Sequence, residues 1–209
     1  RSPLAVINTA GQLLALRSKE IPAQEALAQR ILRGSARLSY FFDNCLTQDR
    51  LDSQNFALEP VDVDVAEMVM WVTENGGQLS NAHTVQHQVE ARLPPLRGDP
   101  VLLRVMLMNL LSNAFKYAPE GTTVLLRASR EGTRCRLSVE DEGPGIHPDE
   151  QQKVFEKYRR GRTAEGKPGA GLGLALVKGI VELHGGTIAL RSRLPTGMCF
   201  VIELPFSVA

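Results

Sequence analysis

Two asparagines and a lysine recur at helical spacing in the segment NLLSNAFKYA. Asn109, Asn113 and Lys116 lie at positions i, i+4 and i+7, so they share one face of a helix. An amide oxygen can bind a hard cation such as Mg²⁺, and a lysine can pair with phosphate. The rest of this helix is apolar, so the three polar groups need partners if they are buried. The alternative is that they form the solvent face of an amphipathic helix.

An acidic bend, EDEGPGI, follows a predicted strand. Asp141 in this bend can accept a hydrogen bond from an exocyclic amine. Gly143 and Gly145 allow the backbone to turn sharply and leave room for a flat ligand. Alone, the pattern indicates only a turn after a strand.

A third motif, GRTAEGKPGAGLGLAL, is rich in glycine. It begins like a P-loop, but Pro168 stands where a P-loop needs Ser or Thr, and no strand precedes it. The alternating Gly169, Gly171 and Gly173 do not match the dinucleotide fingerprint either. Two interpretations remain. The segment is a surface loop with a glycine hinge, or a flexible cationic loop that leads into a turn whose N–H groups face an anion at a helix start.

The patterning of the second half of the chain predicts the scaffold that positions these motifs. Helices are predicted over VDVAEMVMWVTENGGQL, from Asp99 to Tyr117, over HPDEQQKVFEKYRR and over 172–184. Strands are predicted over TVQHQVE, TTVLLRAS, RCRLSVED, GTIALRSR and GMCFVIELP. These elements indicate a layer of helices on a largely antiparallel sheet.

The first part of the chain is predicted to be a helical hairpin, with one helix over 1–17 and a second from Pro22 to about Arg50. In the second helix, small or apolar residues recur at steps of four and three, which is typical of a bundle seam: Leu27, Ile31, Gly34, Leu38, Phe41 and Cys45. Two helices alone cannot bury such a stripe on both sides. A partner copy that completes a four-helix bundle is the simplest solution. The alternative is packing against the second half of the same chain.

The composition is that of an ordinary globular protein, with 209 residues, 43% hydrophobic residues and a net charge of +1. The near-neutral charge argues against nucleic acid as a partner and against direct membrane contact. No apolar run approaches the ~20 residues of a membrane span. Three well-separated cysteines indicate reduced thiols, and we therefore expect a cytoplasmic location.

Taken in order, NLLSNAFKYA, DEGPGI, VFEKYRRG, GAGLGLAL and HGGTI resemble the N, G1, F and G2 boxes and the trailing glycine pair of sensor histidine kinases, which belong to the GHKL ATPases. RSPLAVI at the start is similar to the tail of the H box, so the resemblance covers almost the whole chain. It implies an α+β fold in which residues 1–55 form half of a dimeric four-helix bundle. Residues 56–209 would then form a GHKL-type α/β sandwich that binds ATP.

The resemblance also implies roles for individual residues. Asn113 would hold Mg²⁺, Lys116 would contact phosphate, and Asp141 would bind the adenine amine. The implied nucleotide-binding set is Asn109, Asn113, Lys116, Tyr117, Asp141, Gly143, Gly145, Arg160, Gly169, Gly171, Leu172 and Gly173. Residues 161–168 would be the ATP lid. Lys116 and Arg160 would act in catalysis, Arg160 by stabilising charge near the γ-phosphate.

Some positions depart from the family's pattern. Arg159 stands where an aromatic residue is usual, and Ala170 replaces a common Ser or Thr. Ser2 matches the H-box position that is linked in the family to dephosphorylating the partner. The pattern places the phosphate-accepting histidine three residues before Arg1, and no histidine of this chain matches that position.

The leading hypothesis for function is the catalytic core of a two-component sensor kinase. It would transfer the γ-phosphoryl of ATP to a histidine on the first helix, and from there to an aspartate of a response regulator receiver domain. The alternative is a non-catalytic, kinase-like module that dimerises with or regulates related kinases. A gyrase-, chaperone- or mismatch-repair-type ATPase is a third interpretation, against which the F box and RSPLAVI argue.

Overall fold

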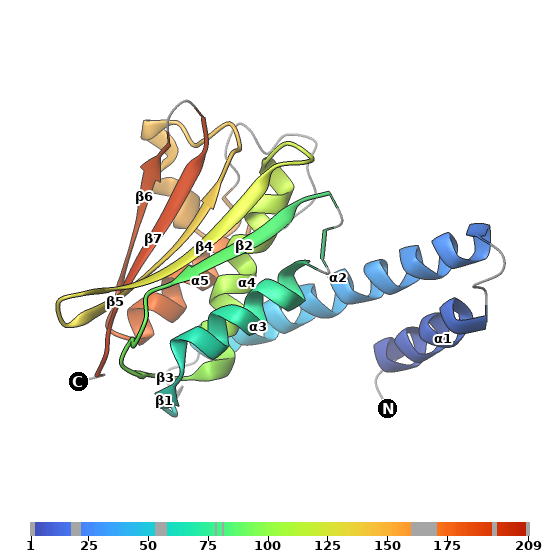
Figure 1. The fold of residues 1–209 in the computed structure, drawn as a ribbon, viewed down its shortest axis with the longest axis horizontal. Helices are drawn as coiled ribbons and strands as arrows, with labels where there is room; N and C mark the ends of the chain where they lie inside the picture. Colours follow the sequence, from blue (N-terminus) through green and yellow to red (C-terminus); the bar gives the residue numbers. More distant parts are fainter. Residues whose placement is uncertain are drawn as a thin grey trace. The chain divides into compact units, whose positions relative to one another are not determined.

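The computed structural model describes residues 3–17, 22–52, 58–77, 79–80, 82–159, 171–193 and 196–207. The chain divides into two compact units, Arg1–Thr47 and Gln48–Ala209. The first unit is helical, and the second unit combines helices with a five-stranded sheet (Figure 1). Within the ranges that the structure describes, no helix combines the length and the hydropathy that spanning a bilayer requires.

The first unit contains α1 (Pro3–Arg17) and most of α2 (Pro22–Asp52). Small residues lie where the two helices meet. A β carbon on Gly11 would come within 2.8 Å of Leu32 Cδ2, and Ala28 and Ser35 are buried on α2. Small side chains at these positions allow the two helices to approach closely.

The predicted apolar stripe of α2 is exposed within this single chain. Leu27, Ile31 and Leu38 are 53%, 38% and 45% exposed. Cys45 is half-buried, and the side chain of Phe41 lies outside the part that the structure describes. A four-helix bundle with a partner copy would bury these side chains, and this bundle stays a prediction.

The second unit has the following elements: β1 (Val61–Val63), α3 (Val65–Gly77), β2 (Thr84–Val89), β3 (Leu96–Gly98), α4 (Pro100–Tyr117), β4 (Thr123–Glu131), β5 (Arg134–Asp141), the 3₁₀ turns η1 (Pro148–Glu150) and η2 (Lys153–Phe155), α5 (Gly173–Leu183), β6 (Thr187–Ser192) and β7 (Met198–Pro205). The main sheet has the strand order β2-β4-β5-β7-β6. Only the β2–β4 pairing within it is parallel. β1 and β3 form a separate antiparallel pair.

The core lies between the sheet and a layer formed by α3, α4 and α5. Successive side chains of a strand point to opposite faces. On β5, Leu137 and Val139 therefore face the helices and are almost completely buried. The α4 side chains that meet them are aliphatic and fully buried, and include Leu103, Met106, Leu107, Leu110 and Leu111. The predicted layer of helices on a largely antiparallel sheet is confirmed.

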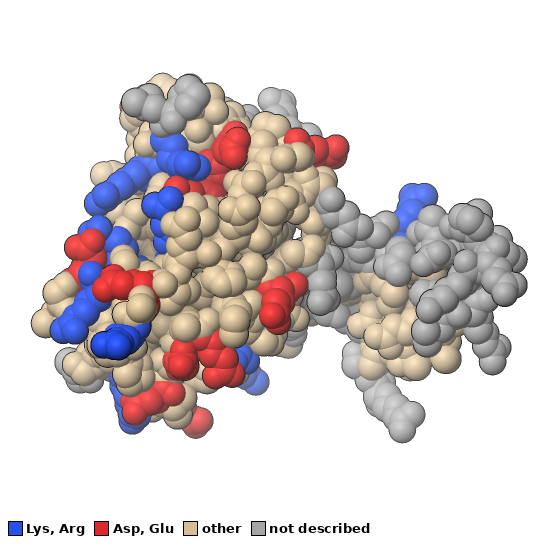
Figure 2. Space-filling view, viewed as in Figure 1, with Lys and Arg blue, Asp and Glu red and all other residues tan. Residues whose placement is uncertain are grey.

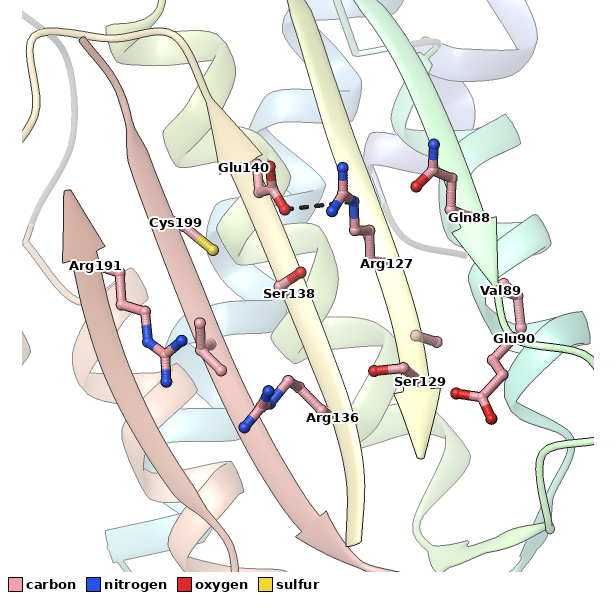
Figure 3. A pocket seen from close by; sticks show the side chains of 12 residues that line it. Gln88, Val89, Glu90, Arg127, Ser129, Arg136, Ser138, Glu140, Arg191 and Cys199 are labelled. Atoms are coloured by element: carbon pink, nitrogen blue, oxygen red, sulfur yellow. Dashed lines mark ion pairs between the residues drawn. The ribbon is translucent and has the colours of Figure 1, made fainter. Parts of the chain in front are cut away.

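The other side of the sheet, here called the open face, is polar. Basic and acidic side chains are interspersed on the face of the second unit that is seen in Figure 2. Close up, arginine, glutamate and serine side chains from neighbouring strands line a hollow of about 540 Å³ on the open face (Figure 3). Long charged side chains thus cover this face of the sheet in place of a second layer of helices.

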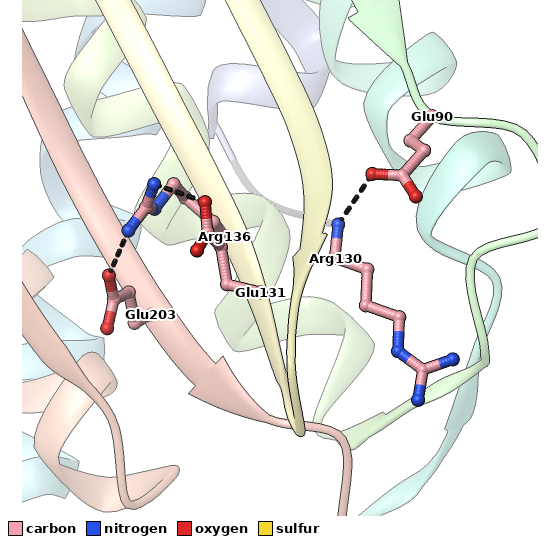
Figure 4. A network of polar contacts seen from close by, with 5 residues as sticks. All are labelled: Glu90, Arg130, Glu131, Arg136 and Glu203. Atoms are coloured by element: carbon pink, nitrogen blue, oxygen red, sulfur yellow. Dashed lines mark hydrogen bonds and ion pairs between the residues drawn. The ribbon is translucent and has the colours of Figure 1, made fainter.

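One cluster on the open face joins β4, β5 and β7 (Figure 4). The Arg136 guanidinium lies 2.8 Å from Glu203 and also pairs with Glu131. Its hydrogen bond with Glu203 raises the pKa of Arg136 and lowers the pKa of Glu203. These side chains are partly exposed, so the cluster covers the sheet but adds little to stability.

Two sequence predictions are wrong. HPDEQQKVFEKYRR is not a continuous helix: where it is described, it forms η1 and η2 with turns between them. Tertiary contacts explain the difference, because Val154 is buried and the Tyr158 N–H donates to the carbonyl of Gly171. The helix predicted from residue 63 begins only at Val65, because residues 61–63 pair with β3.

Candidate nucleotide-binding site

α4 carries the predicted amide-and-lysine face, and its start is fixed by a cap. The Asp99 carboxylate accepts hydrogen bonds from the N–H groups of Val101 and Leu102 at 2.8 and 3.1 Å. Pro100 occupies the first turn, where no N–H is needed. This cap fixes the start of α4 and satisfies two N–H groups of its first turn.

A buried histidine ties the end of α5 to the same cap. His184 is 1% exposed, accepts the Asp99 N–H at Nε2 over 3.0 Å, and contacts the Ile180 carbonyl through Nδ1 at 2.7 Å. Since Nε2 accepts, Nδ1 is the donor and the ring is neutral. Burial lowers the pKa of His184 and so favours this neutral form. α4 and α5 are thus fixed relative to one another.

The three polar residues of α4 differ in environment. Asn109 is 3% exposed, and its amide donates to the Val105 carbonyl at 2.9 Å. Asn113 is half-buried, and its Nδ2 is a buried atom with no hydrogen-bond partner in the described protein. Buried polar atoms normally have partners, so Asn113 is suited to an external ligand. The Lys116 ammonium lies over the Tyr117 ring, 4.8 Å from its centroid.

Asp141 ends β5 on the face of the sheet that carries the helices, and it is 5% exposed. Burial raises the pKa of its carboxyl. Hydrogen bonds from the N–H groups of Gly143 and Met198, and the charge of Arg193, oppose that rise. The Gly143 N–H lies 2.7 Å from Oδ1. Each carboxylate oxygen can accept more than one hydrogen bond, so the carboxylate can also serve a ligand's amine.

Gly143 brings the acidic bend against the end of α4. A β carbon on Gly143 would lie 3.4 Å from Ala118 N and from the carbonyl carbon of Tyr117, and 2.9 Å from Asp141 Oδ1. Gly145, with a φ of +77°, continues the turn beside Gly197. The carboxylate and the lysine end of α4 are thus neighbours.

A second close contact brings the start of α5 to the middle of α4. A β carbon on Gly173 would come within 2.9 Å of Asn109 Oδ1. Leu172 occupies the N-cap position of α5, and Gly171 precedes it with a φ of +73°. The Gly171 carbonyl accepts the Tyr158 N–H at 3.0 Å, so the segment after η2 reaches the same place.

The structure therefore gathers along the C-terminal half of α4 most of the residues that the sequence singles out. These are Asn109, Asn113, Lys116, Tyr117, Asp141, Gly143, Gly145, Gly171, Leu172 and Gly173. Arg160, Gly169, the predicted lid 161–168 and Ser2 lie outside the described residues. Sequence reasoning missed Arg193, which reaches this site only through the pairing of β6 with β7.

A helical layer on this sheet, with an amide face, an acidic bend and a glycine turn at one edge, defines an ATPase domain of the GHKL type. Residues 98–208 match the family of histidine kinase-, DNA gyrase B- and HSP90-like ATPases, and the chain belongs to that family. Its similarity to sensor histidine kinases identifies the matched region as a histidine kinase catalytic domain.

Several relatives support this assignment. The chain is 32% identical over 213 residues to the sensor protein KdpD of Escherichia coli (strain K12), and the match covers 100% of this chain and 23% of KdpD. It is 30% identical over 209 residues to the sensor-like histidine kinase SenX3 of Mycobacterium tuberculosis (strain ATCC 25618 / H37Rv), covering 98% of this chain and 51% of SenX3.

A solved structure matches over the same length. The crystal structure of full-length ShkA in complex with AMPPNP has a TM-score of 0.73 at 30% identity, covering 100% of this chain and 44% of that chain. The chain thus spans about half the length, or less, of the curated relatives named above.

Proposed function

We propose that this chain is the catalytic core of a sensor histidine kinase and that it binds Mg-ATP at the end of α4. The proposal depends on two close contacts: Gly143 brings the Asp141 bend against the end of α4, and Gly173 brings the start of α5 against Asn109. Asn113 and Lys116 lie on α4 between or beside these two contacts. Asp141 would accept the adenine amine, and Lys116 would leave the Tyr117 ring to meet phosphate oxygens. The complex of ShkA with AMPPNP supports ATP as the nucleotide.

Mg²⁺ fits the residues present. In the part of the chain that the structure describes, no group of three or more His, Cys, Asp or Glu side chains could hold a metal by itself. Mg²⁺ keeps several waters and is commonly bound by one or two protein oxygens together with substrate phosphates. The Asn113 side-chain oxygen would supply one such ligand, and the Asn113 Nδ2, which has no partner among the described residues, would donate to a phosphate oxygen. The ion would neutralise charge on the phosphates during transfer.

The wider reaction is inferred from the kinase relatives. A histidine nitrogen on the helical pair would attack the γ-phosphorus, the bond to the β-phosphate oxygen would break, and ADP would leave. The phosphoryl group would then pass to an aspartate of a response regulator. The exposed stripe of α2 supports a homodimer through the first unit. Such a reaction takes place in the cytoplasm, where ATP and response regulators are found.

Calorimetric titration with AMPPNP tests the proposal, with and without Mg²⁺. We expect saturable binding that is weakened at least about tenfold when Mg²⁺ is removed or when Asn113 is changed to alanine. Ser112→Ala, one residue away on the same helix, is the matched control and should bind as the unaltered protein does. Absence of heat for the unaltered protein would refute the proposal.

Phosphotransfer needs a second measurement. A longer piece of the protein that includes the segment before Arg1 would be incubated with γ-labelled ATP. We expect label on a histidine of that segment. Nucleotide binding without any labelling would instead favour the non-catalytic module.

A further inference from the structure

The open face carries one buried carboxylate, Glu140. Its side chain is 12% exposed, and two arginines bracket it. Arg127 Nε lies 3.4 Å from Oε1 (Figure 3), and Arg193 Nε lies 3.4 Å from Oε2. A buried charge is costly unless it is paired, so the two arginines keep this carboxylate in place, and it in turn orients them.

Glu140 and Asp141 are consecutive residues of β5. Their side chains therefore point to opposite faces of the sheet. Glu140 meets the arginines of the open face, whereas Asp141 meets the turn of Gly143 at the end of α4. One peptide unit thus separates the open-face ion pairs from the carboxylate proposed to bind adenine.

Arg193 spans this separation. Its Nη1 donates to the backbone carbonyl of Asp141 at 3.4 Å, while its Nε pairs with Glu140. Its own N–H donates to the Gly197 carbonyl at 3.1 Å, which closes the β6–β7 hairpin. Gly197 in turn lies directly against the Asp141 carbonyl, where no β carbon would fit. The guanidinium is thus held by two contacts, and the Arg193 backbone by a third, all around the end of β5.

The charge of Arg193 also acts on the Asp141 side chain. Burial raises the pKa of that carboxyl, and the nearby guanidinium lowers it. Hydrogen bonding to adenine requires the carboxylate to stay in its acceptor form. Arg193 therefore favours both the position and the ionisation state that the proposed contact needs.

We propose that Arg193 is a positioning residue for nucleotide binding. Arg193 is held by Glu140 on the open face, and it fixes the end of β5 from this face. Asp141, on the opposite face, would then meet the adenine amine in a single orientation. This inference rests on the proposed role of Asp141. It makes the affinity for nucleotide depend on an ion pair that the nucleotide does not touch.

Calorimetric titration of single variants with AMPPNP and Mg²⁺ provides the test. Arg193→Met should weaken binding about 3- to 10-fold, since it removes one charged hydrogen bond that acts through another group. Arg193→Lys should recover part of the lost affinity, because an ammonium retains the charge and a donor but cannot make both guanidinium contacts. Arg191→Met is the matched control. Arg191 also lies on the open face, with its guanidinium directed toward Arg136 in Figure 3, and its loss should leave affinity unchanged.

A double variant tests whether Glu140 acts on nucleotide binding through Arg193. Glu140→Gln should weaken binding less than Arg193→Met does, and combining the two should add nothing to the effect of Arg193→Met. Melting temperatures measured without nucleotide would show that every variant is folded.

The failure of this inference can be told from the failure of the proposed function. If Asp141→Asn reduces binding at least about tenfold but Arg193→Met binds as the unaltered protein does, only the role of Arg193 is overturned. The same holds if Arg193→Lys binds no better than Arg193→Met. If Asp141→Asn has no effect, both proposals fail.

Discussion

Gly173 packs directly on the side chain of Asn109, and a β carbon at position 173 would come within 2.9 Å of Asn109 Oδ1. The contact joins the first turn of α5 to the middle of α4. Asn109 cannot easily give way, because it is 3% exposed and its amide is bonded to the Val105 carbonyl. Because the backbone of Gly173 is helical, any residue could adopt its conformation. Glycine is therefore required here only because a larger side chain would not fit.

Gly173→Ala should lower the free energy of unfolding by about 1–3 kcal/mol, because the added methyl group overpacks a buried contact. In an exposed helix interior, Gly→Ala would instead raise the free energy of unfolding by up to about 1 kcal/mol. The sign of the measured change therefore distinguishes an overpacked contact from an exposed position. Urea denaturation followed by circular dichroism gives the value. Gly179→Ala on the same helix is the control. Its β carbon would lie 3.4 Å from Leu51 Cδ1, an ordinary contact, and we expect no loss of stability.

The pair can be examined further with Asn109→Ala, which removes the atom that would clash. In that background Gly173→Ala should cost at least about 1 kcal/mol less than it does alone. Equal costs in both backgrounds would contradict the assigned contact.

The buried His184 should make the folded protein less stable at mildly acidic pH. Because burial lowers its pKa in the folded protein, the unfolded chain takes up a proton at higher pH than the folded chain does. The stability linked to this group is complete above the unfolded value of about 6.5 and decreases as the pH falls below it. The free energy of unfolding should therefore decrease between pH 7.5 and pH 5. The decrease should be smaller for His184→Gln than for the unaltered protein, by on the order of 1 kcal/mol.

His87→Gln serves as the comparison for this measurement, since His87 is exposed on β2. It should retain the pH dependence of the unaltered protein. A dependence that is equally steep for His184→Gln would show that the buried ring does not titrate as described.

Cys135 should be protected from alkylation. It is completely buried, and burial raises its pKa to about 12. At pH 8 only about one molecule in ten thousand would carry the reactive thiolate. Mass spectrometry after treatment with iodoacetamide should show modification of the half-buried Cys199 first, and of Cys135 only as urea unfolds the protein. Equal rates for the two thiols without urea would be inconsistent with this packing.

The exposed stripe of α2 should control the oligomeric state. If the proposed homodimer forms through this stripe, Leu38→Glu places a charge in an apolar interface and should convert the dimer to a monomer at micromolar concentration. Sedimentation velocity distinguishes the two states. Arg30→Ala, at an exposed position of the same helix, should remain dimeric. A sedimentation coefficient that Leu38→Glu leaves unchanged would locate the interface elsewhere.

The sequence predicted best what depends on local periodicity. α4, which Asp99 caps, and the four antiparallel strands have patterns strong enough to be found without tertiary information. The segment with Val154 was predicted as a helix because its spacing is helical, but docking of that side chain and the bond from Tyr158 to Gly171 override the local preference. β1 and β3 have three residues each, too few to show a period.

The candidate site was predicted as a set of motifs, but not as a set of contacts. The polar spacing of α4 and the glycine positions are visible in the sequence. That Gly173 meets Asn109, or that Arg193 reaches Asp141, depends on how distant segments pack. The parallel pairing of β2 with β4 was also beyond reach, because alternation along a single strand does not reveal the direction of its neighbour.

The strand order has a consequence for biosynthesis. β7 lies between β5 and β6 in the sheet, although it follows both along the chain. Before β7 has been synthesised, β5 can pair with β4 on one side, but its other edge is bare and nothing yet joins it to β6. The central hydrogen-bonded ladder closes only once residues 198–205 have left the exit tunnel. Until then the nascent polypeptide exposes an apolar strand, which makes this the interval in which chaperones would matter most.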